Sequence, residues 1–144
     1  MIELNVTAVI PAQIDRVWAV IRDFNAMPVW HPLIRESRIE TGAPSDQVGC
    51  VRNFSLTNDA RIREQLISLS DLDHSFAYSI LEADVQLLNY TAGVKLKQIT
   101  SDNTSFGQWW AKFDTPPGKE EEMSNMVKND VFQAGFDALV ERFS

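Results

Sequence analysis

The sequence predicts an α+β fold, in which an antiparallel sheet packs against helices gathered on one of its faces. Three observations support this class. Period-two alternation of apolar and polar residues recurs between residues 34 and 114, a long amphipathic segment follows at 119–143, and helical spacing occurs at 13–24, after a first strand. A run of strands bounded by helices is typical of α+β domains. We expect a single domain over residues 1–144, because a chain of this length buries one sizeable core.

The first elements are a strand and two helices. Residues 2–10 are rich in Val, Ile and Thr and alternate weakly, which favours a half-buried strand. Pro11 ends that strand and suits the first position of a helix. Residues 13–24 carry apolar side chains at helical spacing, and a second short helix is expected at 27–30, because Pro32 stops it. The helix-spaced residues are Ile14, Val17, Trp18, Ile21 and Phe24.

Six further strands are expected between the short helices and the C-terminal segment. Each alternates with period two, and turn-rich pieces such as Gly42–Asp46, Asn58–Asp59 and Ser101–Asn103 separate them. Links this short join neighbouring strands into antiparallel hairpins. The expected strands cover residues 34–41, 48–57, 60–69, 75–82, 90–99 and 104–114.

The C-terminal segment at 119–143 is predicted to form one long helix of about 36 Å. Three glutamates crowd its first turn, where the helix dipole favours negative charge. Gly135 lies beside the bulky apolar stripe and is expected to allow close backbone approach, although glycine costs about 1 kcal/mol relative to alanine. The bulky stripe consists of Phe132, Phe136, Leu139, Val140 and Phe143.

A second stripe, of small residues, runs along the same helix. We interpret it as a low-profile exposed face, and the alternative is a contact surface for a second copy in a homodimer. Met123 and Met126, near the helix start, fit plain packing or the rim of a pocket equally well. The small stripe consists of Val127, Val131, Ala134 and Ala138.

Charge and cysteine content count against several classes of function. The chain has 13 basic and 20 acidic residues, a net charge of −7, which disfavours nucleic acid and anionic membranes as partners. Cys50 is the only cysteine, so we expect no internal disulfide, no cysteine-based zinc site and a cytoplasmic location. The sequence has no run of 18 apolar residues and no leader-like start, so membrane insertion and secretion are not expected.

Motifs of common enzyme classes do not occur in the sequence. The chain has no Gly-x-Ser-x-Gly elbow, no Gly-x-x-x-x-Gly-Lys-Ser/Thr loop, no His-Glu-x-x-His and no Gly-x-Gly-x-x-Gly. Hydrolase, nucleotide-binding and zinc-protease functions therefore lose their usual support, and we expect no cofactor and no metal. His31 is interpreted as a surface or capping residue and His74 as part of a solvated turn.

Short segments in a fixed order along nearly the whole chain carry a family resemblance. They are Val9–Phe24, Trp30, Ser37–Glu40, Val48–Arg52, Ile62–Glu64, Phe76–Ile80, Asn89–Tyr90, Trp109-x-x-x-Phe113 and Ala134-Gly135-Phe136-x-x-Leu139. Together they resemble the SRPBCC superfamily, and more narrowly its polyketide cyclase/dehydrase branch, related to START lipid-transfer domains and the birch pollen allergen. The resemblance implies a helix-grip fold: a seven-stranded antiparallel sheet curled around the C-terminal helix, with a mostly apolar cavity between them for a hydrophobic ligand.

Strand alternation assigns side chains to the cavity face. Arg52 and Glu64 both fall on that face, on neighbouring strands, and buried charges are costly unless paired. We therefore expect an ion pair at the cavity wall, and the alternative is that both are solvated near strand ends. Tyr78 and Tyr90 are expected to orient a ligand through their hydroxyls, or to be plain core. The expected ligand-binding residues are Trp30, which we read as a lid or core anchor, Arg52, Phe54, Glu64, Tyr78, Tyr90, Trp109, Phe113, Phe132 and Phe136.

Three hypotheses for the function follow, in order of preference. The first is binding of a hydrophobic small molecule, such as a lipid or polyketide, in the internal cavity. The second is an enzyme of the polyketide cyclase/dehydrase type, which promotes intramolecular aldol condensation and dehydration, with Arg52, Glu64, Tyr78 and Tyr90 as catalytic candidates. The third is an interaction module without catalysis that works through the stripe of small residues.

Overall fold

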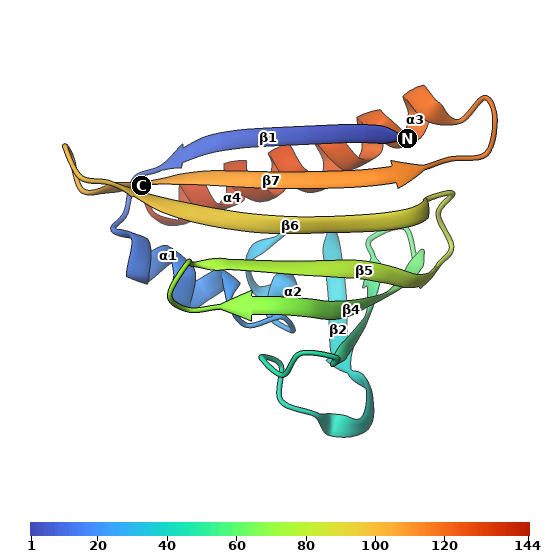
Figure 1. Ribbon diagram of the computed structural model, residues 1–144, viewed down its shortest axis with the longest axis horizontal. Coiled ribbons are helices and arrows are strands. Elements are labelled where there is room, and N and C mark those ends of the chain that lie inside the picture. Colours follow the sequence, from blue (N-terminus) through green and yellow to red (C-terminus); the bar gives the residue numbers. More distant parts are fainter.

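The computed structural model describes residues 1–144 and contains one antiparallel sheet of seven strands, with the long C-terminal helix packed across one face (Figure 1). The strand order across the sheet is β1-β7-β6-β5-β4-β3-β2. This is the predicted α+β helix-grip architecture. The strands are β1 (Ile2–Ile10), β2 (Ile34–Ile39), β3 (Val51–Leu56), β4 (Arg61–Ser70), β5 (Ser75–Ala83), β6 (Leu88–Ile99) and β7 (Thr104–Asp114).

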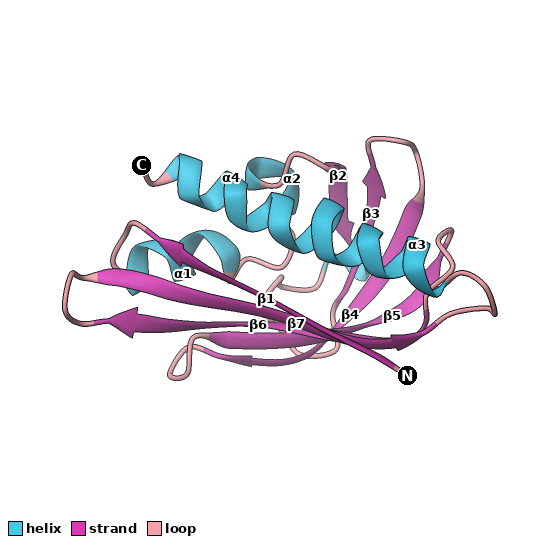
Figure 2. Ribbon diagram, turned by 90° about the horizontal axis from the view of Figure 1, so that it is seen from above, coloured by secondary structure: helices cyan, strands magenta, loops and turns pink.

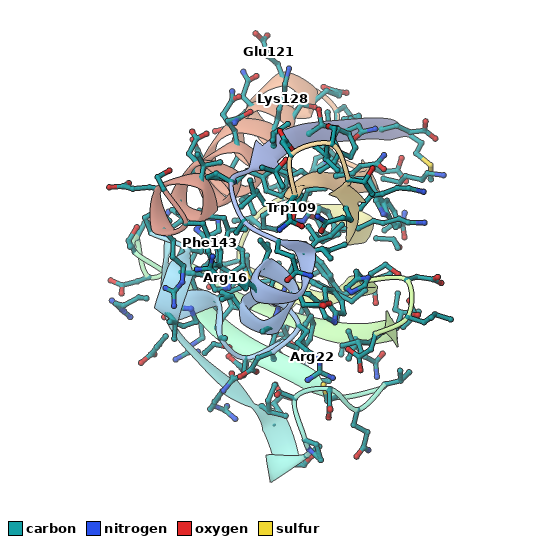
Figure 3. All side chains as sticks on the ribbon, turned by 90° about the vertical axis from the view of Figure 1, so that its left-hand side faces the viewer. Arg16, Arg22, Trp109, Glu121, Lys128 and Phe143 are labelled. Atoms are coloured by element: carbon teal, nitrogen blue, oxygen red, sulfur yellow. The ribbon has the colours of Figure 1, made fainter.

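Two short helices follow β1 and lie on the same side of the sheet as the long helix, near its C-terminal end (Figure 2). They are α1 (Ile14–Ile21) and α2 (Met27–Trp30), and a 3₁₀ turn, η1 (Glu40–Gly42), follows β2. The helix-spaced apolar residues of α1 are buried, as predicted. On its other side, the Arg16 guanidinium lies 5.4 Å from the ring centroid of Phe143, which ties α1 to the end of the chain (Figure 3).

The long helix runs from Glu120 to Arg142 and has three parts. They are α3 (Glu120–Asn125), a π-helical stretch η2 (Met126–Gln133) and α4 (Ala134–Arg142). The predicted element at 119–143 is therefore confirmed, but the sequence pattern did not indicate the π-helical stretch. Such stretches are rare and occur frequently at functional sites. No helix of the chain, this one included, combines the length and the apolarity that crossing a membrane requires.

Three of the strand-to-strand turns depend on a residue with left-handed backbone. The φ angle is +71° at Asp59, +51° at His74 and +60° at Asn103, in the turns after β3, β4 and β6 respectively. Among residues other than glycine, Asn, Asp and His adopt this conformation most readily. These residues thus allow tight antiparallel connections at the places where the sequence predicted them.

The core is centred on Trp109, which lies between the sheet and the long helix (Figure 3). Its ring stacks on Phe132 with 4.6 Å between ring centroids, and it meets Phe136 edge-on at 5.7 Å. Gly107 makes room for this packing, because a Cβ there would lie 2.9 Å from a ring carbon of Phe136. The bulky stripe of the helix therefore faces the sheet, as predicted.

The stripe of small residues does not form the exposed face that we expected. Val127 is fully buried, and Val131, Ala134 and Ala138 are half-buried. The change to π-helical geometry explains the difference, because a wider turn rotates the residues before it relative to those after it. The interpretation as a low-profile exposed face is therefore wrong at Val127.

Candidate functional site

Two small cavities lie inside the apolar core, between the sheet and the long helix. The larger has a volume of about 30 Å³ and the smaller a volume of about 10 Å³. Met27 and Arg52 line both of them. Twelve of the fourteen residues around the larger cavity are hydrophobic. These fourteen are Met27, Ile34, Arg52, Phe54, Leu56, Ile62, Glu64, Tyr78, Ile80, Leu87, Tyr90, Met126, Val127 and Val131.

The two cavities are much smaller than the mostly apolar ligand cavity that the family resemblance led us to expect. One water needs roughly 10 to 15 Å³ of such volume, so the larger cavity has room for about two waters and not for a lipid or polyketide. The protein's own aromatic side chains take up the space: Trp109, Phe132 and Phe136 are fully buried between sheet and helix. The expectation of an open cavity large enough for such a ligand is therefore wrong for this structure.

An ion pair buried in the wall of the larger cavity joins β3 to β4. Arg52 and Glu64 are register partners on these strands, and their exposed fractions are 2% and 5%. Arg52 donates from Nε and Nη2 to Glu64 Oε1, at 2.9 and 2.7 Å, and from Nη1 to the carbonyl oxygen of Phe24 at 3.0 Å. The predicted pairing is confirmed, and the alternative of two solvated side chains is wrong.

Aromatic rings enclose the guanidinium of Arg52. Its Cζ lies 3.8 Å from the ring centroid of Phe24, 4.8 Å from that of Tyr78 and 5.5 Å from that of Phe54. Desolvated cation–π contacts of this kind contribute about 2 kcal/mol and hold the side chain in place. Burial raises the pKa of the Glu64 carboxyl, whereas the charge and hydrogen bonds of Arg52 act in the opposite direction.

Two buried tyrosines complete the polar part of the cavity wall. The indole Nε1 of Trp109 donates a hydrogen bond to the hydroxyl of Tyr78 at 3.0 Å, and the ring of Tyr90 lies 6.4 Å from that of Tyr78. Burial raises the pKa of both hydroxyls above the usual value, so both stay protonated at neutral pH. They can donate hydrogen bonds, and neither is a base in the resting protein.

Comparison with known families agrees with this geometry. The whole chain, residues 1–144, matches the family model described as polyketide cyclase/dehydrase and lipid transport. The chain belongs to this family. The resemblance inferred from short sequence segments is thereby confirmed, and the helix-grip architecture accompanies it.

Several solved structures share the fold of this polyketide cyclase/dehydrase and lipid transport family member. The protein XoxI from Bacillus cereus is 28% identical, with a TM-score of 0.89 and coverage of 99% of this chain and 96% of that one. A protein from Bacillus thuringiensis described as putative and uncharacterized is also 28% identical, with a TM-score of 0.87 and coverage of 99% and 98%. A protein from Thermobifida fusca, 24% identical with a TM-score of 0.88 and coverage of 99% and 93%, shares the fold.

The structure brings most of the predicted ligand-binding residues of this family member to the two cavities. Arg52, Phe54, Glu64, Tyr78 and Tyr90 line the larger cavity. The smaller cavity is lined by Arg52 again and by Trp30, Trp109 and Phe136. Phe113 and Phe132 are buried but line neither cavity.

Sequence reasoning missed part of the cavity wall. Several residues that line the larger cavity were not among the predicted ligand-binding residues; they include Met27, Leu87, Val127 and Val131. Met126, which was considered as a rim residue, lines the cavity too. The signal at Met27 was a flexible apolar residue at the start of a short helix next to the sheet. Leu87 lies in the connection before β6, where no periodic pattern assigns a face.

His31 is buried, with an exposed fraction of 2%, so its interpretation as a surface residue is wrong. The alternative, a capping residue, is confirmed, because His31 is the C-cap of α2. Its Nδ1 accepts from the backbone N–H of Leu33 at 3.1 Å, and its Nε2 lies 2.7 Å from the carbonyl oxygen of Val131. Because a carbonyl only accepts, Nε2 carries the proton and the ring is neutral. Burial lowers the pKa of His31, and the charge of Arg52 adds to that effect. The histidine thus connects α2 to the π-helical stretch.

Trp30 separates the smaller cavity from the surface. It lines that cavity and also an open groove between α2 and α4, and its ring centroid lies 6.2 Å from that of Trp109. Its indole Nε1 is buried and has no hydrogen-bond partner. This position fits the predicted role of Trp30 as a lid or core anchor.

Proposed function

We propose that this chain binds a hydrophobic small molecule in the larger cavity, against the Arg52–Glu64 pair. The observation that carries the proposal is the composition of the cavity wall: twelve hydrophobic residues surround one buried ion pair. Ligand sites are typically apolar with a small number of placed polar groups that fix orientation. A buried ion pair adds little to stability on its own, because desolvation offsets its attraction, so a role in the cavity accounts for it better.

Binding requires the cavity to enlarge, and the helix side of the wall is the part suited to moving. Met126, Val127 and Val131 line the cavity from the π-helical stretch η2. The hydrogen-bond pattern of a π-helix differs from that of the regular helix on either side, and methionine adapts its shape easily. We therefore propose that a ligand takes the place of these side chains as η2 shifts outward.

Apolar burial supplies most of the affinity in this proposal. A ligand that loses roughly 200 Å² of apolar surface to the cavity gains about 5 kcal/mol before ordering costs. The displaced side chains of η2 give back part of that gain, because they lose contacts of their own. We expect micromolar rather than nanomolar binding for small aromatic probes.

The test compares two substitutions on the same helix. Val131→Phe narrows the larger cavity, whereas Ala138→Phe adds the same ring in the surface groove. Native mass spectrometry of the purified chain and displacement of anilinonaphthalene sulfonate measure binding, and circular dichroism shows that each variant is folded. We expect binding to be lost in Val131→Phe and kept in Ala138→Phe. No binding of any apolar probe by the unaltered chain overturns the proposal.

A second candidate function is cyclisation and dehydration of a poly-β-ketone, favoured by the convergence of Glu64 with the two tyrosine hydroxyls on one cavity. In this scheme the Glu64 carboxylate removes a proton from a methylene between two carbonyls. The resulting carbanion forms a carbon–carbon bond to another carbonyl of the same molecule, whose oxygen takes a proton from Tyr78 or Tyr90. The proton held by Glu64 then returns to the tyrosinate, and the new hydroxyl leaves as water with a hydrogen from the neighbouring carbon. Unchanged turnover in a folded Arg52→Met/Glu64→Leu variant rules this scheme out.

A further inference from the structure

The buried ion pair leaves one carboxylate oxygen of Glu64 without a partner. Both hydrogen bonds from Arg52 end on Oε1, and Oε2 receives no hydrogen bond from any protein group. The third bond of Arg52 goes to the carbonyl oxygen of Phe24. Glu64 lines the larger cavity and is 5% exposed. The fully buried side-chain polar atoms without a partner are Trp30 Nε1 and Ser55 Oγ, so Glu64 Oε2 keeps a small accessible surface. Polar atoms with so little exposure are nearly always hydrogen-bonded.

A second arginine–glutamate pair joins β4 to the η1 turn and has a donor for each carboxylate oxygen. Arg63 donates from Nε to Glu40 Oε2 at 2.7 Å and from Nη2 to Glu40 Oε1 at 2.8 Å, so each carboxylate oxygen has its own donor. This is the common fork-to-fork arrangement. Arg52 does not adopt it, because its guanidinium is fixed by the ring and carbonyl of Phe24.

Other donors around the cavity do not satisfy Glu64 Oε2 either. The hydroxyl of Tyr78 accepts a hydrogen bond from Trp109 Nε1 at 3.0 Å and keeps its own proton, but no hydrogen bond links either cavity tyrosine to Glu64. The remaining walls are apolar. The donor must therefore come from a molecule in the cavity, either a water, for which there is room, or a ligand that replaces the hydrogen bond of that water.

We infer that the ligand is an apolar molecule with a hydroxyl or phenol group, which donates a hydrogen bond to Glu64 Oε2. The inference rests on the proposed function and specifies its ligand class. An ionised carboxylate only accepts hydrogen bonds, so an ether or ester at this position gains nothing. A ligand carboxylate, as in a free fatty acid, meets like charge at Oε2 while Arg52 is already engaged.

The experiment uses three probes with one ring system: β-naphthol, its methyl ether and the corresponding naphthoate. Each is titrated into the full chain at neutral pH, with tryptophan fluorescence and calorimetry as readouts. We expect the naphthol to bind about tenfold or more tightly than the ether, because a hydrogen bond to a charged group is among the stronger ones, and the naphthoate to bind most weakly. Equal binding of naphthol and ether overturns the inference but leaves the proposed function standing. Absence of binding by all three overturns the proposed function itself.

Two double variants locate the preference. Arg52→Met/Glu64→Leu removes the buried pair and is expected to bind naphthol and ether equally, whereas Arg63→Met/Glu40→Leu removes the outer pair and keeps the preference. A preference that persists without the buried pair overturns the inference. If the first double variant fails to fold, Glu64→Gln replaces it. Its amide nitrogen can donate to an ether oxygen, so it should bind the ether more tightly than the unaltered chain does, and unchanged ether binding contradicts the inference.

Discussion

Gly135 is the position at which one added methyl group has a calculable effect. A Cβ there would lie 2.7 Å from Trp109 Cζ3, 2.9 Å from His31 Cδ2 and 3.1 Å from His31 Nε2. Carbon atoms in favourable contact are about 3.5 to 4.0 Å apart, so Gly135→Ala forces at least one ring to move. Trp109 is stacked on Phe132 and hydrogen-bonded to Tyr78, and His31 is bonded at both nitrogens, so neither ring moves freely.

The net effect is the difference between two opposing contributions. Alanine is favoured over glycine in a helix by about 1 kcal/mol, and overpacking of a rigid core costs about 1 to 3 kcal/mol. Because both neighbouring rings are fixed, we place the overpacking cost in the upper part of that range. Gly135→Ala should therefore lower the free energy of unfolding by about 1 to 2 kcal/mol.

Urea denaturation followed by circular dichroism measures this change. The same substitution in a Trp109→Phe background is the control, because phenylalanine lacks the second ring that carries Cζ3. The cost of Gly135→Ala should shrink there by about 1 kcal/mol, the size of a typical coupling between residues in contact. A variant as stable as the unaltered chain, or more stable, would refute the packing argument, and an undiminished cost in the Trp109→Phe background would remove Trp109 as its source.

Three further predictions concern charged and titratable groups. Arg52→Met alone should lower the free energy of unfolding by about 3 to 5 kcal/mol, because it leaves the buried Glu64 carboxylate without its partner. Adding Glu64→Leu should restore most of this loss. If urea denaturation shows no restoration, the interpretation of Arg52 and Glu64 as a buried ion pair is contradicted. Arg63→Ala, at the half-buried Arg63–Glu40 pair, should cost less than Arg52→Met by the same measurement, because solvent reaches the carboxylate that is left behind. An equal cost would contradict this. His31 is neutral in the folded protein, and its pKa is lowered there. Below about pH 6.5 the unfolded chain therefore binds a proton at His31 that the folded protein does not. The free energy of unfolding should fall as the pH falls, by at most about 1.4 kcal/mol per pH unit. His31→Gln should remove this dependence while His74→Gln keeps it, and equal pH profiles for all three proteins would contradict the burial argument.

The sheet and its two faces were predictable because each depends on local pattern. Alternation along β6 and β7 is enough to place Val94 and Trp109 inward, and they are register partners. The pairing of Arg52 with Glu64 followed from two further facts: both lie on apolar faces, and a short turn at Asn58–Asp59 brings their strands together. Period and turn chemistry were therefore sufficient for this part of the site.

Features that depend on distant contacts were not predictable in the same way. His31 can be buried because the carbonyl oxygen of Val131, one hundred residues later in the sequence, accepts its hydrogen bond. No residue near His31 in the sequence indicates this partner. An analysis of regular helical period did not find the π-helical stretch. It puts Val127 and Phe132, five residues apart, on different sides of the helix, whereas both are buried in the wider π-helical turn. The volume of the cavity depends on the rotamers of the side chains around it, and the pattern of apolar and polar residues in the sequence does not determine these rotamers.

The contacts of η2 also constrain how the cavity can enlarge. At Val131 the stretch is held by the buried hydrogen bond from His31, and just beyond it Gly135 is packed against Trp109. At its other end, Met126 is half-buried. An outward shift that keeps the His31 bond must therefore begin at Met126 and Val127. These two residues line the same cavity as Glu64, so in the proposed function the shift that admits a ligand enlarges the cavity to which Glu64 belongs.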